Sequence, residues 1–234
     1  MDLVSASVAL DKAELPCHID GLLDPVMLPA LREHGVALGL APEALAARYP
    51  ITSKAAWLQD YGPLLGPCLE PKAERFMLLL DQHIARLRAQ HIRYAEIMLN
   101  GLLFVDPDLA KVQEIFTRFH ACARVAGEGA IQVEFVATIA PGRPEKVARQ
   151  VERVIALHQA GLVCGLALAG LEEEHYSVRP LRRSFEQLRD AGIGIEIHAG
   201  EWAGPQTVWD ALEHGFPQRV GHGVRAFEDA RLLA

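Results

Sequence analysis

Short apolar segments alternate along this chain with longer segments whose apolar residues recur every three or four positions. Runs of β-branched and aliphatic residues indicate six strands, which begin near residues 13, 92, 131, 162, 193 and 219. The helical period, with Asp or Pro near its start, predicts helices between them. These lie at Pro42–Arg48 and Glu70–Arg88 within a mainly helical region 25–90, at 108–126, 143–160, 178–191 and 205–214, and from 226 onwards.

This alternation is typical of a parallel sheet covered by helices. Polar residues gather where most of the strands end, and ligands bind at that end in both barrels and doubly wound sheets. No G-x-G-x-x-G follows the first strand, which disfavours a dinucleotide-binding sheet. We therefore expect one α/β domain over residues 1–234, a TIM-type (β/α) barrel with six of about eight strands. The last two βα units are expected to be missing.

An incomplete barrel would leave its sixth strand with an unpaired, apolar edge. Such an edge pairs readily with another chain, whereas a closed barrel has none. We therefore expect either low stability as a monomer or a homo-oligomer that pairs through this edge.

The stretch from Gly192 to Glu201 combines a strand pattern with chemically active residues. Ile193, Ile195 and Ile197 recur with a period of two, and the strand then ends in His-Ala-Gly-Glu. A second histidine, His222, lies between two glycines at the end of the sixth strand. A buried histidine followed by a turn would explain either motif alone, but two histidines at neighbouring strand ends favour a functional site.

Composition excludes several classes of protein. The chain has 234 residues, a formal net charge of −7 and 50% hydrophobic residues, as in an ordinary globular domain. An acidic chain without a basic run is a poor candidate for nucleic-acid binding. The four cysteines form no C-x-x-C pair, and no apolar run reaches the ~20 residues needed to span a bilayer. We expect a cytoplasmic protein with neither nucleic-acid nor membrane partners.

Three motifs together resemble the adenosine deaminase family, the metal-dependent purine aminohydrolases of the amidohydrolase group. They are His18-Ile19-Asp20-Gly21 after the first strand, His198-Ala199-Gly200-Glu201 after the fifth and Gly221-His222-Gly223 after the sixth. Tyr94–Ile97 and Leu168–Gly170 add to the likeness. The resemblance implies a zinc-dependent enzyme that removes the 6-amino group of a purine nucleoside by hydrolysis, converting adenosine to inosine and ammonia.

The resemblance also implies roles for particular residues. Glu201 would protonate the purine ring, and His222 would orient and help to deprotonate the attacking water. His18 and His198 would bind zinc. Asp20 would hydrogen-bond the ribose, which mildly favours a nucleoside over a free base. The backbone of Gly170 would meet the purine.

Several positions depart from the family pattern. Pro16 stands where the resemblance implies the first histidine of an H-x-H metal pair, and Cys17 is expected to face away from His18. Ala167 and Met98 replace an expected Asp and Arg, and an Asp from an eighth strand would lie beyond this chain. These departures favour an alternative, a non-catalytic or truncated member that retains only a partial purine and metal pocket.

Other polar groups have simpler interpretations. The run Glu172–His175 has the composition of a metal cluster, but a solvated charge run after the fourth strand is the expected structure. Trp57–Tyr61 is compatible with a lid over the pocket or with a helix-packing stripe. The histidines on or near helices, His83 among them, are expected to be solvated or to cap helices.

Overall fold

The computed structural model describes residues 7–22, 27–35, 42–47, 50–58, 73–99, 106–170, 172 and 177–234. The chain forms two compact units. Unit 1 comprises residues 1–97 and 114–134, and unit 2 comprises residues 98–113 and 135–234.

Six strands lie in the described part of the chain, where the hydrophobic pattern predicts them. They hydrogen-bond in chain order, β1 to β6. Their bounds are β1 Lys12–His18, β2 Ile92–Leu99, β3 Gln132–Ile139, β4 Gly165–Leu168, β5 Gly194–Ala199 and β6 Arg219–His222.

The longer helices also follow the sequence pattern. The α-helices of the described residues are α2 Leu28–Glu33, α3 Pro42–Ala46, α4 Lys54–Ala56, α6 Ala73–Ala89, α7 Leu109–Gly127, α8 Pro144–Gln159, α9 Arg182–Asp190 and α10 Pro205–Gly215. The described residues also include short 3₁₀ helices, η1 Ile19–Leu22, η4 Arg179–Leu181, η5 Val224–Glu228 and η6 Ala230–Leu232. None of these helices combines the length and apolar character needed to cross a membrane.

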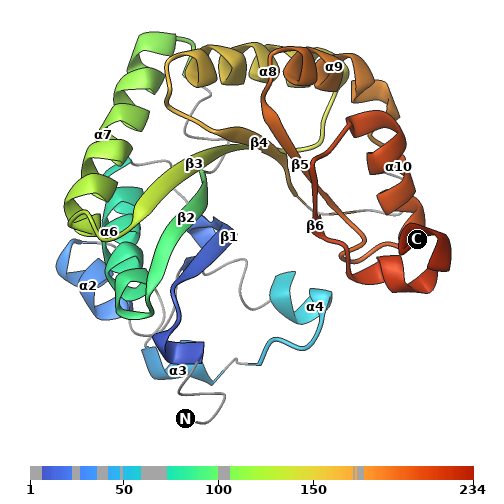
Figure 1. The fold of residues 1–234 in the computed structure, drawn as a ribbon. Coiled ribbons are helices and arrows are strands. Elements are labelled where there is room, and N and C mark those ends of the chain that lie inside the picture. Colours follow the sequence, from blue (N-terminus) through green and yellow to red (C-terminus); the bar gives the residue numbers. More distant parts are fainter. Residues whose placement is uncertain are drawn as a thin grey trace. The chain divides into compact units, whose positions relative to one another are not determined.

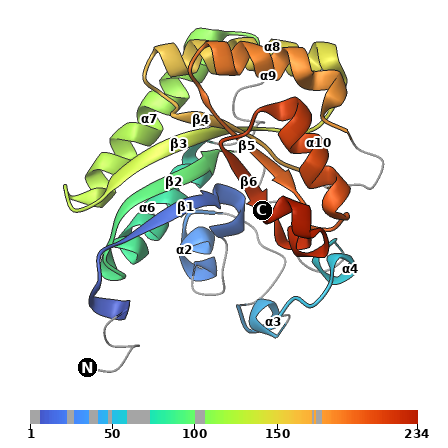
Figure 2. The same ribbon diagram turned by 45° about the vertical axis from the view of Figure 1, so that its right-hand side comes forward.

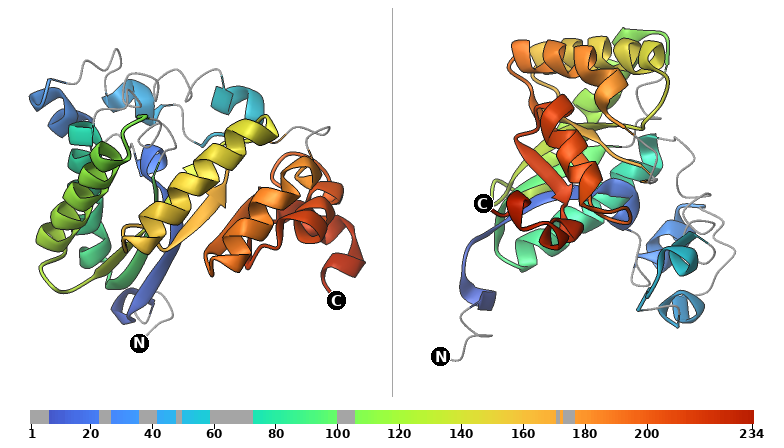
Figure 3. Two further views of the ribbon diagram at one scale, coloured as in Figure 1. Left: turned by 90° about the horizontal axis from the view of Figure 1, so that it is seen from above. Right: turned by 90° about the vertical axis from the view of Figure 1, so that its right-hand side faces the viewer.

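The helix predicted from residue 226 onwards is wrong, because two 3₁₀ turns occupy this segment. Asp229 lies between η5 and η6 with extended backbone, and its side chain accepts the N–H of Arg231. The same carboxylate accepts the Trp209 indole N–H from α10 at 3.0 Å. Asp229 therefore starts a second turn beside α10 instead of continuing the first (Figure 3).

Unit 1 has its core on one face of α6. The residues that the helical period places on this face are all buried: Phe76, Leu79, Leu80, Ile84 and Leu87. His83 lies in the middle of the same helix and is buried, with its Nε2 3.5 Å from Cys17 Sγ of β1, so the prediction that His83 is solvated or caps a helix is wrong. Pro16 lies within β1 although a proline cannot donate a backbone hydrogen bond to a neighbouring strand.

Unit 2 contains the parallel strands β4, β5 and β6 and the part of β3 from Phe135 onwards. Helices α8, α9 and α10 lie on the outer side of these strands (Figures 1 and 2). The apolar stripe of α8 is fully buried and consists of Val147, Val151, Val154 and Leu157. Burying one such side chain contributes about 1.5–3 kcal/mol, whereas an exposed ion pair like Arg143–Glu145 contributes about 0–1 kcal/mol.

Candidate active site

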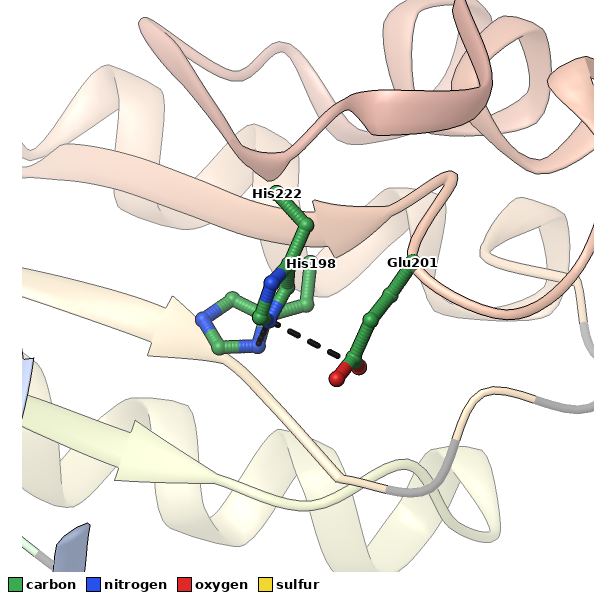
Figure 4. Close-up of side chains that lie close together, drawn as sticks. All are labelled: His198, Glu201 and His222. Carbon is green, nitrogen blue, oxygen red and sulfur yellow. Dashed lines mark hydrogen bonds and ion pairs between the residues drawn. The ribbon is translucent and has the colours of Figure 1, made fainter. Parts of the chain in front are cut away.

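The ends of β5 and β6 bring two histidines together in unit 2. The strands pair in parallel with His198 opposite Gly221 and Ala199 opposite His222. The two imidazole rings meet edge to face, with centroids 4.6 Å apart and planes at 89°. Nε2 of His222 lies 3.2 Å from Nδ1 of His198 (Figure 4).

Glu201 completes this group from the loop that follows β5. Its Oε2 lies 3.6 Å from Nε2 of His222, and Figure 4 shows its carboxylate directed toward the two rings. One donor atom from each of His198, Glu201 and His222 lies within 4.8 Å of the others. We call these three residues the His–Glu–His cluster. The side chains of Glu201 and His222 are 24% and 36% exposed, so a small molecule can reach them.

The glycine that precedes His222 has a steric explanation. His222 itself has a φ of 61°, a left-handed conformation that costs a non-glycine residue about 1–3 kcal/mol. A Cβ on Gly221 would lie 2.4 Å from Cδ2 of His198 and 3.1 Å from Oε1 of Glu196. Only glycine at position 221 therefore leaves room for the His198 ring.

A buried carboxylate on β5 lies behind His198. Oε1 of Glu196 lies 3.6 Å from Nε2 of His198, and its other oxygen lies 3.5 Å from Nε of Arg219 on β6. A carboxylate beside Nε2 favours the proton on that nitrogen and leaves the lone pair of Nδ1 directed into the cluster. The strand pattern carried a signal for Glu196, because a residue two positions before His198 shares its face.

The expectation that Glu172 belongs to a solvated charge run is wrong. Glu172 is only 5% exposed, and its carboxylate accepts backbone N–H groups from the loop that carries Glu201. Burial raises the pKa of this carboxyl, but hydrogen bonds from Thr207, Ala203, Trp202 and Gly200 outweigh burial and bring the pKa below its ordinary value. Residues 173–176 lie outside the described residues.

The remaining predicted site residues lie at strand ends. Gly170 follows β4 in unit 2 with a φ of 154°, and a Cβ there would lie 3.0 Å from Cδ of Pro141. His18 is the last residue of β1 and is half-buried, and Asp20 lies in η1, both in unit 1. Trp57 follows α4 directly, whereas residues 59–61 of the suggested lid lie outside the described residues.

The donors of unit 2 fit a zinc ion. Two imidazole nitrogens and a carboxylate oxygen are ligand types that zinc accepts, and one such atom from each residue of the His–Glu–His cluster lies within 4.8 Å of the others. Pro16 and Cys17 in β1 are poorer candidates for metal ligands. Pro16 has no donor, and burial, with a contribution from Glu14, raises the pKa of the Cys17 thiol to about 12. Cys17 is therefore a protonated thiol at neutral pH and a poor metal ligand.

Two departures from the expected motifs share one apolar environment. Met98 and Ala167 are both buried and pack in a cluster with Val136, against which Cys164 also packs. An arginine and an aspartate at these positions would place two charges in this cluster, and a buried ion pair is often no more stable than a well-packed apolar pair. Met98 and Ala167 therefore suit the apolar cluster in which they lie.

Comparisons with known proteins identify the family of this chain. The model of the adenosine deaminase family matches residues 11–234. An adenine deaminase from Sinorhizobium medicae is 32% identical over 238 residues, which span 96% of this chain and 68% of that protein.

Two solved structures show the fold. An adenine deaminase from Arthrobacter aurescens superposes with a TM-score of 0.74 at 22% identity, over 94% of this chain and 67% of that one. An amidohydrolase from Burkholderia ambifaria with bound Zn has a TM-score of 0.73 at 20% identity, over 97% of this chain and 63% of that one. The prediction of an α/β, TIM-type barrel fold with six described strands is confirmed.

Proposed function

Because this chain belongs to the adenosine deaminase family, we propose that it hydrolyses the exocyclic amine of a 6-aminopurine. Water adds to C6, the C–N bond breaks, and a 6-oxopurine and ammonia leave. The observation that carries the proposal is the His–Glu–His cluster, which combines a carboxyl group and two imidazoles at the ends of two parallel strands.

Two side chains of the cluster supply the proton transfers. Glu201, in its protonated form, gives its proton to the ring nitrogen next to C6, because that nitrogen gains basicity as the carbon becomes tetrahedral. His222 is proposed to orient the attacking water and to help to deprotonate it, and its ring lies close to Glu201, with Nε2 at 3.6 Å from Oε2 of Glu201. This short distance lets both groups act on one reacting centre.

His198, through Nδ1, and His18 are the proposed zinc ligands. Zinc, when bound, supplies the Lewis acidity that makes water nucleophilic at neutral pH. Glu196 supports this assignment, since it faces the opposite nitrogen of the His198 ring. The structurally similar Burkholderia ambifaria amidohydrolase is described with bound Zn. Pro16 removes one donor, so we expect zinc to bind more weakly than in a site with three or more protein ligands.

Different observations favour adenine and adenosine as the substrate. The similar proteins from Sinorhizobium medicae and Arthrobacter aurescens are named adenine deaminases, which favours the free base. Asp20, proposed to hydrogen-bond a ribose, favours adenosine. In either case the backbone of Gly170 is proposed to contact the purine.

An assay on the zinc-loaded chain tests the proposal. The ultraviolet absorbance change of deamination is followed with adenosine and with adenine, and zinc is measured on the same sample. We expect turnover of one of the two purines, and none by Glu201→Gln prepared in the same way. Stoichiometric zinc without turnover of either purine would contradict the proposal.

A non-catalytic role is the second candidate, and Pro16 is the observation that favours it. Under this alternative the chain binds a purine near the cluster without hydrolysing it. Calorimetric titration with adenosine and adenine separates the two candidates, because binding without product formation supports the second.

A further inference from the structure

Glu172 is bound to the loop of Glu201 more extensively than a surface carboxylate could be. Its two oxygens accept four successive backbone N–H groups: Gly200 at 2.7 Å, Glu201 at 3.0 Å, Trp202 at 2.6 Å and Ala203 at 2.8 Å. Successive N–H groups that converge on one point form an anion-binding nest. In this chain the anion is a side chain of the chain itself.

The side chain of Thr207 ties the same carboxylate to helix α10. Its hydroxyl donates to Oε1 of Glu172 at 2.5 Å, and its oxygen accepts the N–H of Gly200 at 2.9 Å. Thr207 is buried and lies in the first turn of α10. The loop and the start of the helix are therefore held by one network.

The opposite side of the loop is also bonded. The N–H of Arg225 donates to the carbonyl of Gly200 at 2.9 Å, and its guanidinium donates to the carbonyl of Trp202 at 3.2 Å. Gly200 has a φ of 65°, and a Cβ there would lie 2.8 Å from Cγ2 of Val208. The backbone on both sides of Glu201 thus has little freedom.

We propose that Glu172 is a positioning residue, which holds the backbone of Glu201 so that its carboxyl group faces His222. The catalytic importance of this role rests on the proposed function. The position of the Glu201 side chain can be tested whether or not the chain is active. Because each of these donors is an N–H or O–H group, Glu172 has to act as an acceptor at both oxygens. A glutamine would present an NH₂ group to one set of donors and lose those bonds.

The test compares Glu172→Gln with Glu186→Gln, which makes the same chemical change on α9, where Glu186 is paired with Arg182 and its side chain is 37% exposed. Amide hydrogen exchange is measured by NMR for residues 200–203, along with nuclear Overhauser contacts between the Glu201 side chain and the His222 ring. We expect exchange at least tenfold faster and loss of these contacts in Glu172→Gln alone. Exchange in β4 and α9 should stay within twofold of the unchanged protein.

Thr207→Val provides a second variant if Glu172→Gln does not fold. It keeps the side-chain shape and removes the hydroxyl, so we expect the same changes in residues 200–203 to a smaller extent. Unchanged Glu201–His222 contacts in the variant that folds would overturn the proposal. Loss of protection throughout unit 2 would also overturn it, because that result indicates a general structural role.

Kinetics of the zinc-loaded chain separate this inference from the proposed function. With turnover, Glu172→Gln should lower kcat at least tenfold and leave KM within threefold, since it misplaces the acid without removing a binding group. An equal change in KM would overturn the positioning role. If the unchanged protein has no activity, the proposed function fails, while the NMR result still decides the role of Glu172.

Discussion

The ends of β1 and of β5–β6 carry the same kind of motif, but the described residues that flank the two motifs differ in chemistry. At β5–β6, Glu196 lies behind His198, Gly221 leaves room for its ring, and Glu172 binds the loop of Glu201. At β1, Pro16 offers no donor and Cys17 is a protonated thiol. The two strand ends therefore differ in the donors that they offer, although their motifs look alike in the sequence.

The largest effect is expected from removing the carboxyl group of Glu201, at the ends of β5 and β6. Glu201→Gln keeps the size of the side chain but cannot transfer a proton, and general acid catalysis contributes roughly 10²–10⁴-fold. We expect kcat of the zinc-loaded chain to fall by about that factor, with purine affinity within threefold by calorimetry. If Glu201→Gln retains half of the activity, Glu201 is not the catalytic acid.

The next largest effect is expected from adding a metal-binding side chain at position 16 of β1. Pro16→His places an imidazole two residues before His18, on the same face of β1. We expect zinc affinity to rise by about tenfold or more, measured by competition with a chelator. Leu15→His is the matched control, because Leu15 is exposed on the other face, and its affinity should not change. Equal gains in both variants would mean that the added histidines bind zinc nonspecifically.

A methyl group at Gly221 tests the steric support of His198. Gly221→Ala places a Cβ 2.4 Å from the His198 ring, so the ring has to move or the strands have to separate. We expect a loss of about 1–3 kcal/mol in the free energy of unfolding by urea and weaker zinc binding. Gly194→Ala in β5 is the control, since its added Cβ would make only an ordinary contact at 3.8 Å. If both variants are equally stable, the ring is not confined as described.

Acid should weaken the support that Glu172 provides. Its pKa is lower in the folded protein than in the unfolded chain, so its contribution is fully present above the unfolded value of about 4.3 and is lost as pH falls through the folded value. Replacing it by glutamine should cost about 1–3 kcal/mol at pH 7. The difference between Glu172→Gln and the unchanged protein, followed by urea unfolding, should shrink below pH ~4. A difference that grows on acidification would contradict the assigned direction.

The smallest effect is expected at Cys17. Burial raises the pKa of its thiol to about 12, so it should react slowly with iodoacetamide at pH 7 and contribute nothing to zinc binding. Cys17→Ala should leave the zinc content unchanged. Rapid labelling, or zinc loss in this variant, would mean that the β1 region supplies a thiolate ligand after all.

The local pattern determined the elements and the positions of the motifs. Strand and helix periods depend on neighbouring residues, so the six strands and the apolar face of α6 could be predicted without any knowledge of packing. The motifs at His198 and His222 could be predicted as well, because parallel strands end at one edge of a sheet.

Only the tertiary structure decided which polar and charged residues are buried and which groups they contact. Glu172 and Glu201 are 29 residues apart, and no period in the sequence connects them, so a polar run was the natural expectation for Glu172. His83 was expected in solvent for the same reason, although it is buried against Cys17 of β1. Burial of a polar group depends on partners brought from distant segments, and these partners exist only in the folded chain.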